Sequence, residues 1–275
     1  MDVFLAQAVM LVPLLVFLGL LAGFMAGLLG VGSGIVLVPG LYYLFKTLGH
    51  SESLLMHLAV GTSLAIIIPT GLSSAMAHAR QGAVRFDLVR HIGPGIVAGV
   101  AAGTWLASGM NAQEMKTIFA VALICFAVLM QLPSKKTESE NRSLGFIKGS
   151  AGGFIVGGIS SLMGIGGATL NVPFMTLNGI AIHNAVASAS ALGPFIALPG
   201  AIGFMIIGWH ESGLPPFSLG YVNLLAFCVI APLGVLAAPY GARVAHKVSV
   251  TVLRRIFSIF IVMVAARMLM DAYHG

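Results

Sequence analysis

The sequence has few charged residues for its length. Only 14 Lys and Arg and 8 Asp and Glu occur among 275 residues, a charged fraction of 8%, whereas soluble domains carry about 25%. So few charges cannot cover the surface of a water-soluble globule of this size. Because 58% of the residues are hydrophobic and the mean hydropathy is +1.01, we expect an integral membrane protein.

Cysteines and membrane-embedded acids are also scarce. Cys125 and Cys228 both lie in apolar runs, which argues against a disulfide or a metal site, and we expect no cofactor. Sodium sites and cation pumps usually need a carboxylate inside the membrane, whereas an anion pathway does not. All eight acids lie at segment ends or in one polar stretch: Asp2, Glu52, Asp87, Glu114, Glu138, Glu140, Glu211 and Asp271.

The hydrophobic runs predict helices. A bilayer core of about 30 Å needs about 20 helical residues, and eight runs qualify. Two shorter runs, 35–46 and 169–178, reach only about 15–18 Å. No Lys or Arg precedes the first run, so we expect it to be retained and not cleaved as a signal peptide. The long runs cover residues 3–29, 54–78, 88–109, 114–132, 145–163, 184–208, 219–240 and 251–271.

The chain divides into two similar halves. A polar linker at 133–144 separates a first membrane repeat, 1–132, from a second, 145–275. Five positions of the first half recur 134 residues later, and His57 matches His183 at an offset of 126. The recurring positions are Gly19, Gly23, Gly30, Gly32 and Pro39, which match Gly153, Gly157, Gly164, Gly166 and Pro173.

The basic loops predict the topology. Although the net charge is +6, the positive residues gather in loops 80–91, 135–148 and 243–255, which the positive-inside rule places in the cytoplasm. We therefore expect no nucleic-acid partner. These loops share one side only if each half crosses an odd number of times, which inverts the halves and leaves both termini outside the cytoplasm. Ten spans satisfy this, and so do six spans with two re-entrant hairpins.

The predicted fold is thus an all-α polytopic membrane protein with two inverted-topology repeats. Each repeat contains a glycine-rich break, "GLLGVGSGIVLVPG" at 27–40 and "SLMGIGGATLNVPF" at 161–174. Matched broken helices in inverted repeats are typical of the central site of a transporter, and helix N-termini at the breaks favour an anion. The expected glycine positions are Gly30, Gly32 and Gly34, with Ser33, in the first half and Gly164, Gly166 and Gly167 in the second.

Neutral side chains complete the expected site. Hydroxyls and one amide near the breaks can donate hydrogen bonds to an anion: Thr62, Ser63, Asn171, Ser188 and Ser190. His57 and His183 admit two interpretations, as interfacial residues or as groups that couple or gate transport with a proton. Glu52 is expected only to cap a helix, together with Ser51 and Ser53.

The paired motifs resemble the TauE/SafE family of sulfite and organosulfonate exporters. "GLLGVGSGIVLVP" and "GGISSLMGIGGATLNVP", each followed by an "AVGTSLA"-like patch, carry the resemblance, which spans nearly the whole chain. It implies a multi-pass transporter of the bacterial inner membrane. The implied substrates are sulfite, sulfonates, sulfoacetate and related organic oxyanions, with export as the expected direction. Whether the chain forms a homodimer is left open.

Other functions were weighed against this one. A passive anion channel would share the broken helices and stays an alternative. An intramembrane serine protease would use Ser33, but the matching position of the second half is Gly167, so we expect no enzyme. A nucleotide-binding loop would need a Lys that "GVGSG" lacks. A structural scaffold would tolerate Gly→Ala changes at both breaks.

Overall fold

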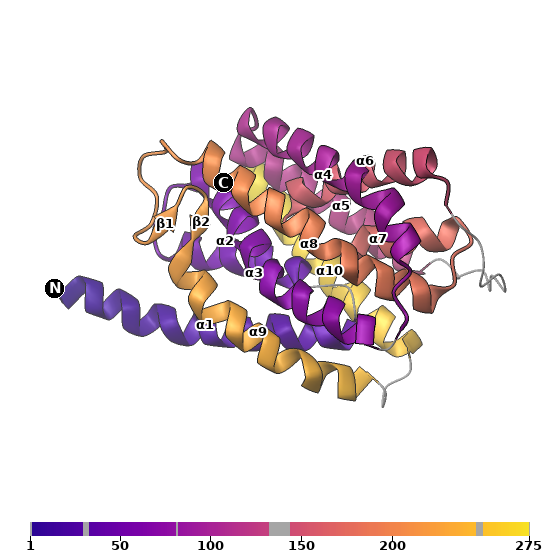
Figure 1. The fold of residues 1–275 in the computed structure, drawn as a ribbon. Coiled ribbons are helices and arrows are strands. Elements are labelled where there is room, and N and C mark those ends of the chain that lie inside the picture. The colour runs from indigo at the N-terminus through magenta and orange to yellow at the C-terminus, as the bar shows by residue number, and fades with distance from the viewer. Residues whose placement is uncertain (1, 30–32, 81, 132–143, 246–249, 275) are drawn as a thin grey trace.

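A computed structural model shows residues 2–29, 33–80, 82–131, 144–245 and 250–274, which form ten helices and one small β-hairpin (Figure 1). Eight helices are long and two are short, as predicted. In chain order they are α1 (Asp2–Leu29), α2 (Gly34–Thr47), α3 (Glu52–Arg80), α4 (Phe86–Ser108), α5 (Ala112–Gln131), α6 (Phe146–Met163), α7 (Ala168–Leu177), α8 (Ile182–Ile207), α9 (Leu224–Ala245) and α10 (Val250–His274).

The hydrophobicity of these helices confirms a polytopic membrane protein. Five of the described helices contain a segment long and apolar enough to cross a bilayer, by length and composition. These segments are Glu52–Met76, Ala112–Leu129, Phe146–Met163, Ile182–Ile207 and Leu224–Gly241.

The start of α9 differs from the prediction. Residue 219 was expected to be helical, but β1 (Ser218–Leu219) pairs with β2 (Val222–Asn223) in an antiparallel hairpin. The Oδ1 of Asn223 accepts a hydrogen bond from the Ala226 amide at 2.9 Å, which caps the helix that follows. Hydropathy alone missed this boundary because the hairpin residues are themselves apolar.

Both broken segments form antiparallel helical hairpins. Leu18 of α1 lies against Gly40 of α2, and Gly152 of α6 lies against Phe174 of α7. Each member of the second contact stands 134 residues after its counterpart in the first. The same hairpin therefore occurs twice. In each copy the short helix runs back toward the end of the bundle at which the preceding long helix begins. α2 has 14 residues and α7 has 10, too few for either helix to cross a bilayer, which favours the re-entrant alternative.

Each hairpin packs on a helix from the other half. The most extensive helix contacts are those of α1 with α9 and of α4 with α6. Gly23 of α1 lies against Gly234 of α9, and Gly157 of α6 lies against Ile96 of α4. Glycine is needed at these positions because a Cβ would collide with the backbone of the neighbouring helix.

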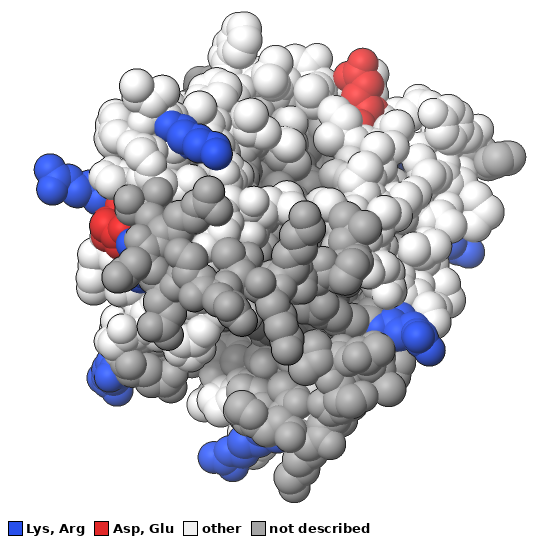
Figure 2. Space-filling view, turned by 90° about the vertical axis from the view of Figure 1, so that its right-hand side faces the viewer, with Lys and Arg blue, Asp and Glu red and all other residues white. Residues whose placement is uncertain are grey.

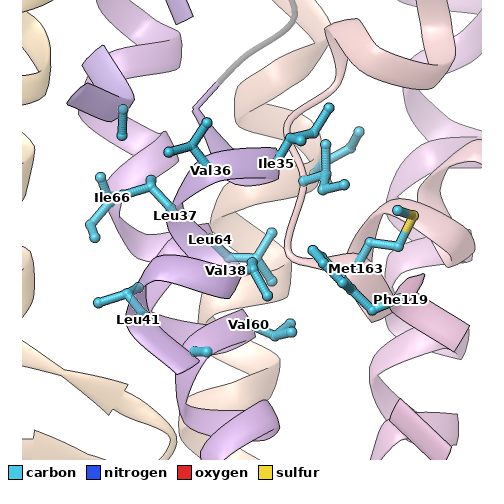
Figure 3. Close-up of a cluster of buried hydrophobic side chains, with 14 of the residues drawn as sticks. Ile35, Val36, Leu37, Val38, Leu41, Val60, Leu64, Ile66, Phe119 and Met163 are labelled. Carbon is cyan, nitrogen blue, oxygen red and sulfur yellow. The ribbon is translucent and has the colours of Figure 1, made fainter. Parts of the chain in front are cut away.

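The centre of the bundle is the α3–α8 pair, which runs antiparallel. Gly61 of α3 faces Phe204 of α8, and Leu64 faces Gly200. α2 packs beside α3 through apolar side chains over most of its length, with Leu37 and Leu41 fully buried. Figure 3 shows the side chains of α2 close to those of α3, with Phe119 and Met163 alongside. The core therefore holds the short helices firmly in place.

One end of the bundle is basic. α3 ends at Arg80, α4 follows Arg85, and α9 carries Arg243 in its last turn. Figure 2 looks onto the side of the molecule that lies to the right in Figure 1 and shows Lys and Arg side chains around its rim. The prediction that this end faces the cytoplasm depends on this clustering of Lys and Arg side chains.

Candidate functional site

The second break begins at Gly164, which ends α6. Its φ of 62° is left-handed, a conformation that favours glycine, and a Cβ there would come within 2.9 Å of Val38 Cγ2 and Val60 Cα. The Gly164 carbonyl accepts a hydrogen bond of 2.8 Å from Ser63 Oγ. The turn is thus held against α3 near the middle of that helix.

The two breaks touch each other. A Cβ on Gly34, at the start of α2, would lie 2.8 Å from the Cα of Ile165 and closer still to the carbonyl oxygen of Gly164. Only glycine at this position lets α2 begin directly beside the turn between α6 and α7. Two segments that lie about 130 residues apart in the sequence therefore meet at one point inside the bundle.

A cavity of about 130 Å³ opens beside this contact. It has room for about four water molecules at about 30 Å³ each, or for a small polyatomic ion. None of the described residues that line it is charged. The lining comprises Gly23, Ala26, Gly27, Ser33, Ile67, Thr70, Gly71, Ser74, Gly166, Gly167, Ala168, Ala189, Ser190, Gly193, Gly234 and Ala238.

Two helix N-termini face this cavity. Ser33 precedes α2 and Gly167 precedes α7, and both residues line it. The first turn of a helix has N–H groups without intrahelical partners and carries roughly half a positive charge. The Oγ of Ser33 is buried and has no hydrogen-bond partner among the described residues. The cavity therefore offers donors and positive potential without a cationic side chain.

Several predicted residues hold structure instead of lining the cavity. Thr62 Oγ1 accepts a hydrogen bond from the Asn223 amide at 2.9 Å, and Ser188 Oγ accepts one from the Arg85 amide at 3.0 Å. Asn223 and Arg85 immediately precede α9 and α4, so the same contact occurs twice, each time between one half and the other. These hydroxyls fix the starts of two helices.

Only some of the remaining predicted residues line the cavity. Ser190 and Gly166 line the cavity, although the Ser190 hydroxyl donates to the Val186 carbonyl of its own helix at 3.0 Å. Asn171 is fully buried in α7, and its amide atoms have no hydrogen-bond partner in the described part of the chain. Gly30 and Gly32 lie outside the described residues.

The matched histidines occupy different environments. His57 is buried, and its Nε2 lies 3.0 Å from the carbonyl oxygen of Ala107, so this nitrogen donates the hydrogen bond. Its ring centroid is 4.9 Å from that of Tyr221. His183 is exposed at the start of α8. Neither residue lines the cavity, so a role in coupling or gating would act at a distance from it.

Thr70 and Ser74 line the cavity but were not predicted. "IPTG" at 68–71 is similar to "LPGA" at 198–201 of the second half, so Thr70 could have been found from this pair of motifs. Thr70 donates to its own helix at the Ile66 carbonyl, 3.0 Å away. Ser74 stands one turn later and is exposed, which places it at the mouth of the cavity.

Comparison with known proteins agrees with this architecture. The family profile described as "Sulfite exporter TauE/SafE" matches residues 15–268. The chain belongs to the TauE/SafE family. This confirms the resemblance drawn from the paired glycine motifs.

Relatives of this TauE/SafE protein carry transporter names. A "Probable membrane transporter protein" of Haemophilus influenzae is 36% identical over 93% of this chain and 97% of its own length. YunE of Bacillus subtilis and MJ0441 of Methanocaldococcus jannaschii, named in the same way, are 26% and 25% identical over 94% and 92% of this chain and 97% and 93% of their own. No solved structure matches the chain. The protein is a membrane transporter.

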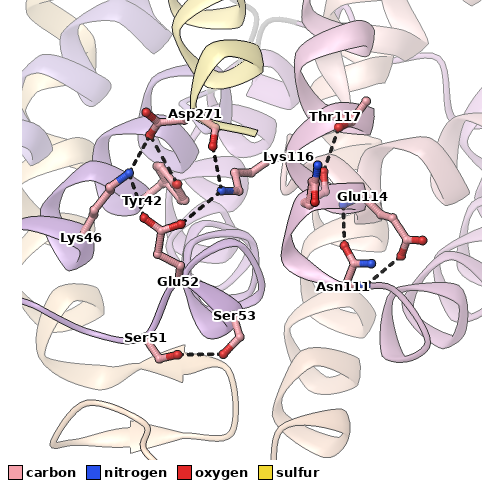
Figure 4. A network of polar contacts seen from close by, with 11 residues as sticks. Tyr42, Lys46, Ser51, Glu52, Ser53, Asn111, Glu114, Lys116, Thr117 and Asp271 are labelled. Carbon is pink, nitrogen blue, oxygen red and sulfur yellow. Dashed lines mark hydrogen bonds and ion pairs between the residues drawn. The ribbon is translucent and has the colours of Figure 1, made fainter. Parts of the chain in front are cut away.

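This TauE/SafE chain also has an ionic cluster that was not predicted (Figure 4). Glu52, expected only to cap α3, pairs with Lys46 at 2.9 Å and with Lys116 at 3.7 Å. Lys46 also pairs with Asp271 at 3.1 Å. Ser51 and Ser53 hydrogen-bond to each other at 2.8 Å. The cluster joins α2, α3, α5 and α10 at the end of the bundle opposite the basic end.

Proposed function

We propose that the protein is a secondary transporter that binds small oxyanions in the cavity between the two breaks. Sulfite, sulfonates, sulfoacetate and related organic acids are the proposed substrates, and export across the inner membrane is the proposed direction. The family description names sulfite and export, and the other oxyanions are proposed from the resemblance of the paired glycine motifs. We further propose that both termini face away from the cytoplasm and that a proton is the coupled ion.

One observation carries the proposal: the N-termini of α2 and α7 meet at a cavity whose described lining residues include no charged side chain. Two helix dipoles and unpaired amides suit a compact anion. A cation would find no carboxylate among these described lining residues. Inverted repeats with broken helices supply the symmetry on which alternating access depends.

Transport by purified protein in liposomes tests this function. Uptake of sulfite, methanesulfonate and sulfoacetate is measured with and without a pH gradient, and saturable uptake of at least one oxyanion is expected. In Gly166→Val transport should be lost, because the new side chain fills the cavity. A Cβ at Gly166 would lie 3.3 Å from Ile67 Cγ2, so this side chain must shift by a few tenths of an ångström, and gel filtration in detergent checks that the variant still folds.

Gly145→Ala is the matched control, because a Cβ at Gly145 meets nothing within 4 Å and the residue lies far from the cavity. It should transport like the wild type. Flux that does not saturate and does not respond to a pH gradient would identify a passive anion channel. Normal transport in Gly166→Val would place the substrate elsewhere.

A further inference from the structure

The cavity opens toward one end of the molecule. Among the described lining residues, Ser74 is exposed, and five are partly exposed: Ala26, Gly27, Thr70, Gly71 and Ala238. Ser74, Thr70 and Gly71 lie in the second half of α3, which ends at Arg80 on the basic end of the bundle. Ala26 and Gly27 lie in the last turn of α1, and Ala238 lies in the second half of α9, which carries Arg243 in its last turn. The structure therefore shows a site that is open toward its basic end.

The repeat assigns each lining residue a counterpart in the other half. Matching contacts give the number of residues that separates equivalent positions in the two halves. This offset is 134 residues between the α1–α2 and α6–α7 hairpins, 126 between α3 and α8, and 138 between α4 and α9. Gly167 and Gly193 correspond to Ser33 and Ile67, which also line the cavity, so the centre is shared. The counterpart of Gly166 is Gly32, which lies outside the described residues. The other counterparts are Gly34, Ser63, Leu64, Ile96, Val100, Gly157, Ser160, Ser161, Ile196, Ala197 and Gly200.

This counterpart region is closed. Each of its described residues is buried, with Leu64, Ile96 and Val100 at 0% exposure. Leu64, Ile96, Val100 and Ile196 stand where the open side has Ser190, Gly234, Ala238 and Thr70. A Cβ on Gly200 would lie 2.9 Å from Leu64 Cδ1 and 3.6 Å from Val100 Cγ1. Large apolar side chains thus fill the space that is empty on the other side.

One polar group within the closed region has no role in the packed state. Ser160 is fully buried, and its Oγ has no hydrogen-bond partner among the described residues. A buried hydroxyl without a hydrogen-bond partner destabilises the packed state. Its counterpart, Ala26, lines the open cavity. Ser160 therefore occupies a lining position in a path that is closed in this structure, and water or an anion would satisfy it once the path opens.

We propose that Leu64, Ile96, Val100 and Ile196 form an apolar gate that closes the second access path to the site. When these side chains separate, Ser160 and Ala197 line a cavity that opens away from the basic end. The proposal rests on the transport function proposed above and assigns the residues of its second conformation. The gate residues come from α3, α4 and α8, so opening requires α4 and the α6–α7 hairpin packed on it to move relative to α3.

Cysteine accessibility tests the gate. Ser160→Cys and Ala197→Cys are made in a chain carrying Cys125→Ala and Cys228→Ala, together with Ala26→Cys for the open path. Ala120→Cys is the buried control, because this α5 residue is 0% exposed and belongs to neither path. A membrane-impermeant cationic methanethiosulfonate is applied to vesicles of either orientation, with and without sulfite or methanesulfonate.

We expect Ala26→Cys to react from the basic end and Ser160→Cys and Ala197→Cys to react from the opposite end. Added oxyanion should change these rates in opposite directions. Ala120→Cys should stay unreactive. If Ser160→Cys fails to insert, Ala197→Cys provides the same readout.

Two results would overturn the gate: reaction of both cysteines from the basic end only, or reaction no faster than that of Ala120→Cys in variants that still transport. Labelling from opposite ends in a protein that moves none of the oxyanions would support the gate and reject the proposed substrates. Failure of the two proposals can therefore be told apart.

Discussion

At the scale of single residues, the hydroxyls near the breaks have different roles. Ser63 Oγ donates to the Gly164 carbonyl and holds the second turn, whereas the Oγ of Ser33 lines the cavity without a partner in the described chain. A group that the fold does not use remains available to a ligand. The local sequence could not distinguish the two, because the partner of Ser63 lies 101 residues away.

Ser33→Ala should weaken substrate binding without lowering stability. One lost hydrogen bond is worth about 0.5–1.5 kcal/mol, so we expect KM to rise roughly 2- to 10-fold. Liposome uptake measures KM, and thermal unfolding in detergent measures stability. Ser63→Ala is the matched control and should lower the unfolding temperature. An unchanged KM in Ser33→Ala would remove this hydroxyl from the site.

The roles of the other predicted hydroxyls were also missed because their hydrogen-bond partners lie far away in the sequence. Thr62 and Ser188 match between the repeats and lie in hydroxyl-rich patches, which favoured a binding role. Their actual partners are the backbone amides of Asn223 and Arg85, more than 100 residues away in each case. In the structure the two positions make equivalent contacts, which the differing patches "GTS" and "ASAS" did not reveal.

At the scale of helices and hairpins, the sequence predicted most of the arrangement. Runs of about 20 apolar residues and two glycine-rich interruptions located all ten described helices. The choice between crossing and re-entrant segments could not be made, because it depends on contacts such as Leu18 with Gly40. The ionic cluster was missed because its members come from four helices and each looks like an ordinary residue at a helix end.

Glu52→Gln tests the energetic role of that cluster. Lys116 has a side chain only 5% exposed, and without the carboxylate it retains the Asp271 carbonyl oxygen at 3.5 Å and the Tyr42 ring at 5.5 Å. Losing a partner of a buried charge costs about 3–5 kcal/mol, but Glu52 is 45% exposed, so we expect a loss of about 1–2 kcal/mol.

The double variant Glu52→Gln/Lys116→Met should recover much of this stability, because it also removes the buried charge. Chemical denaturation in detergent would measure both variants. If the double variant is less stable than Glu52→Gln alone, Glu52 is not the group that offsets the cost of burying the Lys116 charge.

At the scale of the whole molecule, two inverted halves build one site, and each half packs its hairpin on the other. α1 lies on α9 and α6 lies on α4, so neither hairpin is held by its own half alone. Loop charges predicted the inversion. The exchange of partners could not be predicted, because hydrophobic periodicity does not identify which helices pack together.

The asymmetry between the halves explains why this conformation is open toward the basic end. Small residues line one access path and large apolar ones fill its counterpart, so closing the first path and opening the second would expose buried apolar surface. The repeat was visible in the sequence. Recognising that Leu64 is the counterpart of Ser190, and that it fills the closed path, required the offset between α3 and α8 that the structure supplies.

Equilibrium binding of methanesulfonate and of dimethyl sulfone, its neutral analogue of similar shape, most directly tests whether converging helix N-termini select a negative solute. Isothermal titration of the purified transporter should show methanesulfonate binding to the wild type and Gly145→Ala, none to Gly166→Val, and no binding of dimethyl sulfone. Equal affinity for the two compounds, or undiminished methanesulfonate binding in Gly166→Val, would contradict the anion site.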